Sequence, residues 1–190
     1  MTTAQKIAGA ARKLLDEEGA EAVSMRRVAT AVGITPMALY RHYSNRDGLL
    51  NTLADEGFAD LAERLATLRL RGEIDRQLIR ILDVFVDYAF ERPRLFELMF
   101  LTKREGARQY PEDFRARRSP TANLSADVIA RAMEEGYFAQ ADVWEIVFET
   151  GALMQGLVML YLGGRMAVTP AEFRALCHRS FGRYLNGIRK

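Results

Sequence analysis

The chain has 190 residues, and its 27 Lys and Arg against 25 Asp and Glu leave a formal net charge of +2. A single cysteine, Cys177, excludes an intramolecular disulfide and is typical of a reducing cytoplasm. The N-terminus shows no signal pattern, and the longest uncharged apolar run, Gly151–Gly164, is too short to span a bilayer. We therefore expect a cytoplasmic protein that does not enter a membrane.

The small excess of positive charge lies near the N-terminus. Residues 1–50 contain seven Lys and Arg and five Asp and Glu, whereas the remainder contains 20 of each. No alternating strand pattern occurs, so the chain is expected to be helical almost throughout. The first predicted helix runs from Lys6 to Gly19, and its inner stripe is formed by Ile7, Ala11, Leu14 and Leu15.

Residues Ser24–Arg46 carry the strongest functional pattern. They hold four arginines and no acidic residue, and their length suits a short helix, a tight turn and a second short helix. Ser24 can cap the first helix, and Gly33 can end it because glycine enters the left-handed conformation without a steric cost. Thr35 can cap the second helix, and Pro36 suits its first position. A cationic helix-turn-helix of this kind is typical of proteins that bind the major groove of DNA.

The second helix of this motif is predicted to present one side to solvent. Ala38 and Leu39 can face inward, and Asn45 can cap a third helix that begins at Arg46. The outward residues are then Thr35, Pro36, Met37, Tyr40 and Arg41. The pattern predicts a DNA-binding regulator.

The run VATAVGITPMALYRHYSNRDGLL resembles the DNA-binding signature of the TetR family of transcriptional regulators. The match includes Gly33, the Leu39-Tyr40 pair, His42, Tyr43 and the Asn45-Arg46 start of the next helix. The resemblance is specific over residues 1–50 and holds in outline over the rest. It implies an all-helical homodimer on an inverted-repeat operator of double-stranded DNA, released when a small molecule binds the larger domain.

The resemblance also implies roles for single residues. Arg26 is expected to reach a base edge, since arginine paired with guanine is the commonest specific contact. Met37 can make only apolar contact, for example with a thymine methyl group. Phosphate contacts are expected from Ser24, Tyr40 and Arg46. The complete expected DNA-binding set is Ser24, Arg26, Arg27, Thr35, Pro36, Met37, Tyr40, Arg41, His42 and Arg46.

Four of these residues have a second interpretation. Tyr40 can be a half-buried packing residue, and the Arg27 side chain can be solvated. Arg41 can read a base, contact a phosphate or remain in solvent. His42 can be structural or lie beside a phosphate.

Four helices are predicted between Arg46 and Glu135. The first runs from Arg46 to about Leu70 and, by the family resemblance, connects the DNA-binding and sensing domains. Apolar residues at helical spacing predict further helices at 73–91, 94–102 and 120–135. The polar segment 103–119 is interpreted as a mobile loop or a frayed helix, and as a solvated connection rather than a second nucleic-acid site despite Arg115, Arg117 and Arg118.

Two apolar helices complete the chain. Residues 141–162 are apolar on most faces, so this helix is expected to be buried on several sides. In the family, such a helix and the last one form a four-helix bundle with their symmetry mates. The Met154-Gln155-Gly156 triplet stands where one C-terminal subtype has Trp-His-Gly. The expected dimer interface is Trp144, Gly151, Phe173, Cys177, Phe181 and Tyr184.

An effector site is expected among the helices of the larger domain. Aromatic and methionine side chains there suit a small, mainly apolar ligand with one or two polar anchors. Glu149 can be such an anchor or can belong with Glu145 to a solvated stripe, and the apolar residues can also be ordinary core. The candidate residues are Phe85, Tyr88, Phe96, Met99, Phe100, Phe148, Glu149 and Met154.

No catalytic, metal or cofactor site is predicted. Cys177 and His178 are adjacent on a helix and point about 100° apart, so they do not face each other as a nucleophile and its base would. The predicted fold is all-α with about nine helices. A three-helix helix-turn-helix domain is expected at residues 1–48, and an effector-binding and dimerisation domain at 49–190. The predicted function is a ligand-released repressor, and the alternative is a helical adaptor that has lost DNA binding.

Overall fold

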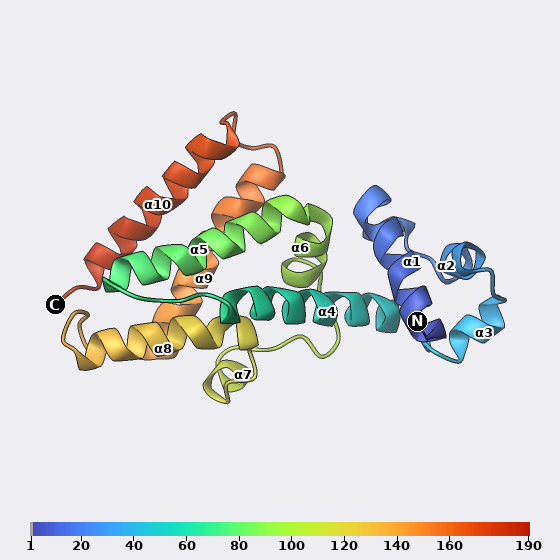
Figure 1. The fold of residues 1–190 in the computed structure, drawn as a ribbon, viewed down its shortest axis with the longest axis horizontal. Helices are drawn as coiled ribbons and strands as arrows, with labels where there is room; N and C mark the ends of the chain where they lie inside the picture. Colours follow the sequence, from blue (N-terminus) through green and yellow to red (C-terminus); the bar gives the residue numbers. More distant parts are fainter. Residues whose placement is uncertain (1) are drawn as a thin grey trace. The chain divides into compact units, whose positions relative to one another are not determined.

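The computed structural model describes residues 2–190, and over that range it contains ten α-helices and no β-strand (Figure 1). The all-α prediction is confirmed. The additional helix is α7 (Glu112–Arg115), which lies in the polar segment that was expected to be irregular or frayed. The chain divides into two compact units. One contains the residues up to Asp60 together with Glu91–Ala107, and the other contains Leu61–Phe90 and Arg108–Lys190.

The first unit is built around the N-terminal helices. Its elements are α1 (Thr3–Glu18), a 3-10 turn (Ala20–Ala22), α2 (Met25–Val32), α3 (Pro36–Tyr40), α6 (Pro93–Phe100) and the first part of α4 (Arg46–Ala66). α1 packs against α2 and α6, and α2 packs against α3. Apolar residues at helical spacing are fully buried where these helices meet, among them Ile7, Leu15, Val28, Leu39 and Leu53. The short α3 is therefore held by packing as well as by its own hydrogen bonds.

A glycine permits the close approach of α6 to α4 within this unit. A Cβ atom added at Gly57 would lie 2.6 Å from Sδ of Met99 and 3.3 Å from Cδ1 of Leu95. Met99 is only 4% exposed, so its side chain has little freedom to move away. Because any larger residue at this position would collide with α6, the absence of a side chain at Gly57 sets the spacing of the two helices.

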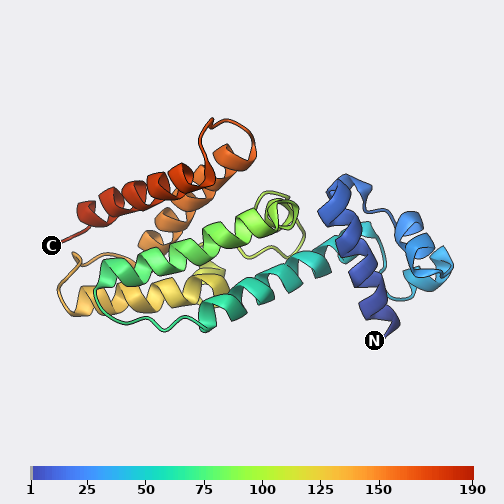
Figure 2. The ribbon, with the colours of Figure 1, turned by 45° about the horizontal axis from the view of Figure 1, so that its top comes forward.

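The second unit contains the longer helices of the C-terminal part. They are α5 (Ile74–Glu91, of which Glu91 belongs to the first unit), α8 (Pro120–Glu134), α9 (Val143–Leu162) and α10 (Pro170–Gly187). α9 packs against both α8 and α10 (Figure 2). The core includes Val86, Ile129, Phe138, Val158 and Phe173, all almost completely buried. The predicted helices lie within a few residues of the observed bounds.

Ion pairs order the polar segment before α8. Arg115 pairs with Asp142 at 2.5 Å, and Arg117 pairs with Asp127 at 2.7 Å. Arg118 pairs with Asp113 at 2.7 Å. Each of these three arginine side chains keeps about half or more of its surface exposed, so the segment is a solvated connection that ion pairs hold in place.

Among the described residues, α9 is the helix whose length and composition would allow it to cross a membrane. The sequence argument did not anticipate this because it considered only uncharged residues, and α9 includes Glu145 and Glu149. One side of α9 is buried in the second unit through Ile146, Val147 and Met154. A helix of a globular protein that packs within its subunit on one side and against a partner on another can be as apolar as a membrane-spanning helix.

Candidate nucleic-acid interface

The local hydrogen bonds of the helix-turn-helix agree with the capping predictions. The Ser24 hydroxyl accepts the Arg27 N–H at 3.3 Å, and the Thr35 hydroxyl accepts the Ala38 N–H at 3.2 Å. Gly33 ends α2 with φ 76°, in the left-handed region. Pro36 occupies the first turn of α3, where its missing N–H leaves no bond unmade. These four residues set the turn between the two helices.

α3 is anchored on one side and open on the other, as predicted. Leu39 is fully buried and holds α3 against the core of the first unit. Met37 is 69% exposed and Tyr40 is 48% exposed, and Thr35, Pro36 and Arg41 are also exposed. The Asn45 side chain accepts the Gly48 N–H at 2.7 Å and starts α4 immediately after the motif. The outward side of α3 is thus exposed to solvent, and no other part of the described chain covers these residues.

Arg27 is engaged within the first unit. Its guanidinium donates to both carboxylate oxygens of Glu18, at 2.5 and 3.0 Å, and to the Ala22 carbonyl at 3.3 Å. The hydrogen bond from Arg27 lowers the pKa of the Glu18 carboxyl. Arg27 therefore ties α2 to the end of α1, a role that sequence reasoning missed because its partner lies nine residues earlier in another helix.

Arg46 is likewise engaged, although it was expected to hold a phosphate. Its guanidinium donates to the Val23 carbonyl at 2.7 Å and to the Ala20 carbonyl at 2.6 Å. The side chain joins the start of α4 to the 3-10 turn between α1 and α2. These hydrogen bonds position the motif, and the expected phosphate contact of Arg46 stays a prediction.

Two arginines of the motif remain available. Arg26 and Arg41 are exposed, and neither forms an ion pair with a carboxylate of residues 2–190. His42 is exposed beside them. We call the group of exposed residues around α3 the recognition surface, defined as Arg26, Thr35, Pro36, Met37, Tyr40 and Arg41. Because no acidic residue occurs between Ser24 and Arg46, this surface is cationic at its margins.

The residues expected to bind an effector do not lie in one compact unit. Phe96, Met99 and Phe100 belong to the first unit, whereas the other five belong to the second. Tyr88 is fully buried with the Arg64 guanidinium 5.0 Å from its ring centre. Phe148 stacks on Tyr110 with ring centres 4.4 Å apart. The remaining members of the second-unit group are Phe85, Glu149 and the buried Met154.

The aromatic stripe of α10 faces inward, contrary to the expected dimer interface. Phe173 and Cys177 are fully buried and Phe181 is 5% exposed, so these side chains contact the chain's own core. Burial raises the pKa of the Cys177 thiol to about 11. The error arose because an apolar helix stripe has the same spacing whether it faces a core or a partner.

The other three residues expected at the interface are at or near the surface. Trp144 is half-buried with the Arg117 guanidinium 5.9 Å from its ring centre. Gly151 is exposed, and half-buried Tyr184 donates its hydroxyl proton to Glu149. These three positions can still lie at an interface.

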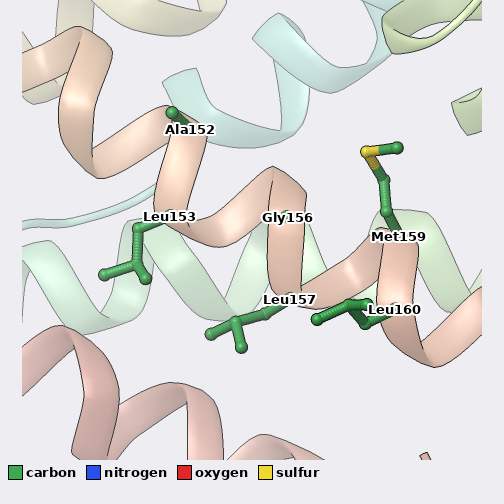
Figure 3. A pocket seen from close by; sticks show the side chains of 6 residues that line it. All are labelled: Ala152, Leu153, Gly156, Leu157, Met159 and Leu160. Carbon is green, nitrogen blue, oxygen red and sulfur yellow. The ribbon is translucent and has the colours of Figure 1, made fainter. Parts of the chain in front are cut away.

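α9 has an exposed apolar face, as expected for a helix that packs within the subunit on one side and against a partner on another. Phe148, Met159 and Leu160 are 44%, 44% and 49% exposed. A shallow hollow on this helix is lined by Ala152, Leu153, Gly156, Leu157, Met159 and Leu160 (Figure 3). Leu153 and Leu157 project to one side of α9 and Met159 to the other (Figure 3). The buried residues include every fourth position from Ile146 to Val158, and this leaves the opposite face of α9 exposed.

Two family descriptions match the chain, and together they span most of its length. Residues 7–53 match the bacterial regulatory proteins of the tetR family, and residues 78–183 match the tetracyclin repressor-like C-terminal domain. The chain is 26% identical over 99 residues to the uncharacterized HTH-type transcriptional regulator YobS of Bacillus subtilis strain 168. That match covers 52% of this chain and 52% of YobS, so the chain spans about half the length of this relative.

Solved structures share the fold at low sequence identity. A protein of unknown function from Rhodococcus sp. RHA1 is 20% identical with a TM-score of 0.79, covering 100% of this chain and 97% of its own. The fatty acid degradation regulator FadR from Bacillus halodurans is 16% identical with a TM-score of 0.72, covering 97% of this chain and 99% of its own. The C-terminal family match alone covers more than half of the residues, and the chain therefore belongs to the tetR family of bacterial regulatory proteins.

Proposed function

We propose that this regulator binds an inverted-repeat DNA operator as a homodimer and represses transcription until a small apolar molecule releases it. The observation that carries the proposal is the recognition surface. α3 is anchored by buried Leu39, and its exposed side is flanked by Arg26 and Arg41, which have no carboxylate partner in the described part of the chain. Free cations beside an exposed helix complement the phosphates that border a major groove.

The DNA contacts divide by chemistry. Arg26 is proposed to read a base edge, and Ser24 and Tyr40 to contact phosphates. Arg41 and His42 are proposed to contact the backbone beside the groove. Thr35, Pro36 and Met37 complete the surface that enters the groove.

The exposed face of α9 is the proposed dimer interface. This face contains large apolar side chains, such as Met159 and Leu160, and also small residues, such as Gly151 and Gly156. A Cβ at either glycine would meet nothing within 4 Å in this chain, so a second helix could approach closely there. An apolar patch of this kind on a protein surface marks an interaction site. With its symmetry mate, each α9–α10 pair would complete a four-helix bundle.

The effector is proposed to bind the helices of the C-terminal part, with Phe148, Glu149 and Met154 among its contacts. Glu149 accepts a hydrogen bond from the Tyr184 hydroxyl, and this contact supports its proposed role as a polar anchor. The ligand would act through its different affinities for the DNA-competent and released states. We also propose that the C-terminal part resembles the subtype with a Trp-His-Gly triplet, of which the Met154-Gln155-Gly156 triplet shares only the glycine. We propose a cytoplasmic location, where such a regulator meets the chromosome.

The proposal is tested by selecting random duplexes with the purified protein at a fixed, near-physiological salt concentration. An enriched inverted repeat supports it, whereas no enrichment with or without cell extract contradicts it. On the selected operator, Arg26→Ala is expected to weaken binding by about 1–3 kcal/mol per lost base pairing and to relax the preference at one position. Tyr40→Phe should weaken selected and random duplexes alike. Equal losses on both for Arg26→Ala would reject the assignment of Arg26.

A further inference from the structure

The tip of α3 presents an apolar side chain to solvent. Met37 is 69% exposed, the largest fraction among the exposed large hydrophobic residues of the described chain. Neither packing nor an internal contact accounts for this exposure, since its neighbour Leu39 already anchors the helix. The recognition surface therefore includes an exposed methionine that contributes little to the packing of the chain.

The groups around Met37 offer little hydrogen bonding to a base. The Thr35 hydroxyl oxygen accepts the Ala38 N–H with one lone pair and keeps a single proton to donate, and Pro36 has no N–H at all. Ala38 contributes only a methyl group. The first turn of α3 thus differs from a surface that reads bases through paired amide or guanidinium donors, which would recognise adenine or guanine edges.

The major groove has one apolar feature that such a surface can recognise. It is the C5 methyl group of thymine, which favours contact with apolar side chains. Arg26 and Arg41 belong to the same motif, are exposed and have no carboxylate partner in residues 2–190, so this surface attracts anionic groups such as the phosphates that border a DNA groove.

We infer that Met37 is a specificity-determining residue that reads the C5 methyl group of one thymine in each operator half-site. The inference rests on the proposed function, since it names how the same recognition surface selects its sequence. Arg26 reads a hydrogen-bonding base edge beside this position, whereas Met37 supplies discrimination by apolar contact.

The test replaces each thymine of the selected operator with deoxyuridine, which lacks only the methyl group. One symmetric pair of positions is expected to respond, with Kd rising about fourfold for each half-site changed, as for loss of one buried methyl-sized contact. A second duplex carries cytosine in place of the responsive thymine and should bind weakly. Replacing this cytosine with 5-methylcytosine restores the methyl group and should recover part of the affinity. Kd is measured by fluorescence anisotropy at constant salt.

Variants link this response to Met37. Met37→Ala should bind the thymine and deoxyuridine operators equally, and Met37→Leu should keep most of the difference because it retains an apolar contact. Tyr40→Phe is the matched control on the same helix, and it should weaken binding while leaving the deoxyuridine response unchanged. Circular dichroism confirms that each variant is folded, which is expected for a side chain this exposed.

The outcomes separate this inference from the proposed function. An enriched operator whose thymines all tolerate deoxyuridine would overturn the role of Met37 and leave the regulator proposal standing. A deoxyuridine response that persists in Met37→Ala would also overturn it, by assigning the methyl contact to another residue. Failure to select any operator would overturn the proposed function and this inference with it.

Discussion

Four arginines of one motif have different tasks because different groups lie within their reach. Arg27 reaches the Glu18 carboxylate, and Arg46 reaches the carbonyls of Ala20 and Val23. Arg26 and Arg41 point to solvent. A guanidinium that completes its hydrogen bonds inside the protein stabilises the scaffold, whereas a solvated one is available to bind phosphate or a base.

Replacing Arg46 with alanine is expected to affect stability first. The change removes two charged hydrogen bonds to backbone carbonyls, which should lower the free energy of unfolding by about 1–3 kcal/mol. Urea denaturation followed by circular dichroism measures the loss. Arg26→Ala is the control, with an expected change within about 0.5 kcal/mol because the residue is solvated. If both variants lost the same stability, the assignment of Arg46 as a positioning residue would be wrong.

Cys177 is expected to be inert in the folded protein. Its side chain is fully buried, and burial raises the pKa of the thiol to about 11. The reactive thiolate is therefore scarce at pH 8 and also inaccessible. Reaction with a chromogenic disulfide reagent should be slow in buffer and fast in denaturant. Rapid stoichiometric labelling of the native protein would show that the α10 stripe opens to solvent.

At the scale of helices, the ends of each element are determined by single residues. Thr2 and Gln5 form a reciprocal capping box at α1, and Thr169 and Glu172 form another at α10. Gly33 provides the left-handed residue between α2 and α3. Because these signals act within a few residues, they position the helices of the motif before any long-range packing is considered.

Replacing Gly33 with alanine tests the turn. A Cβ at Gly33 would meet no atom within 4 Å, so the cost comes from the backbone conformation alone. We expect destabilisation of about 1–2 kcal/mol, the cost of a left-handed conformation for an ordinary residue. Thermal unfolding measures it. Gly33→Asn should lose less, since asparagine tolerates this conformation. A larger loss with asparagine than with alanine would contradict the backbone explanation.

For the whole molecule, the question is how the exposed face of α9 is covered. The side opposite Ile146 and Val158 leaves Met159 and Leu160 in solvent in a single chain. Burial of these side chains against a second copy would remove apolar surface from water and would bring two recognition surfaces onto one DNA. Dimerisation and operator recognition are therefore expected to fail together.

Introducing a charge at Leu160 tests this link. In a symmetric dimer, Leu160→Glu would bury two like charges, so the protein should become monomeric in sedimentation experiments. Affinity for the inverted repeat should fall toward that for a single half-site. Ala66→Glu, at an exposed position at the end of α4, is the control and should remain dimeric. A Leu160→Glu protein that stays dimeric would assign the interface to another surface.

The residues of the helix-turn-helix were largely predictable from the sequence. Caps, the left-handed glycine and the first-turn proline act locally, so the motif, its exposed side and the helical class of the chain followed from short patterns. The same was true of the family, whose signature lies in consecutive residues.

Only the tertiary structure decided which charged side chains form hydrogen bonds or ion pairs within the chain and which apolar side chains are buried in it. Arg27, Arg46 and the arginines before α8 find partners far along the chain or across a turn, and periodicity does not reveal such partners. It also showed that Phe173 and Phe181 of α10 face the core while α9 keeps an open apolar side. An apolar stripe indicates that a helix face is buried. Whether the chain's own core or a partner subunit buries it depends on contacts between residues that are distant in sequence.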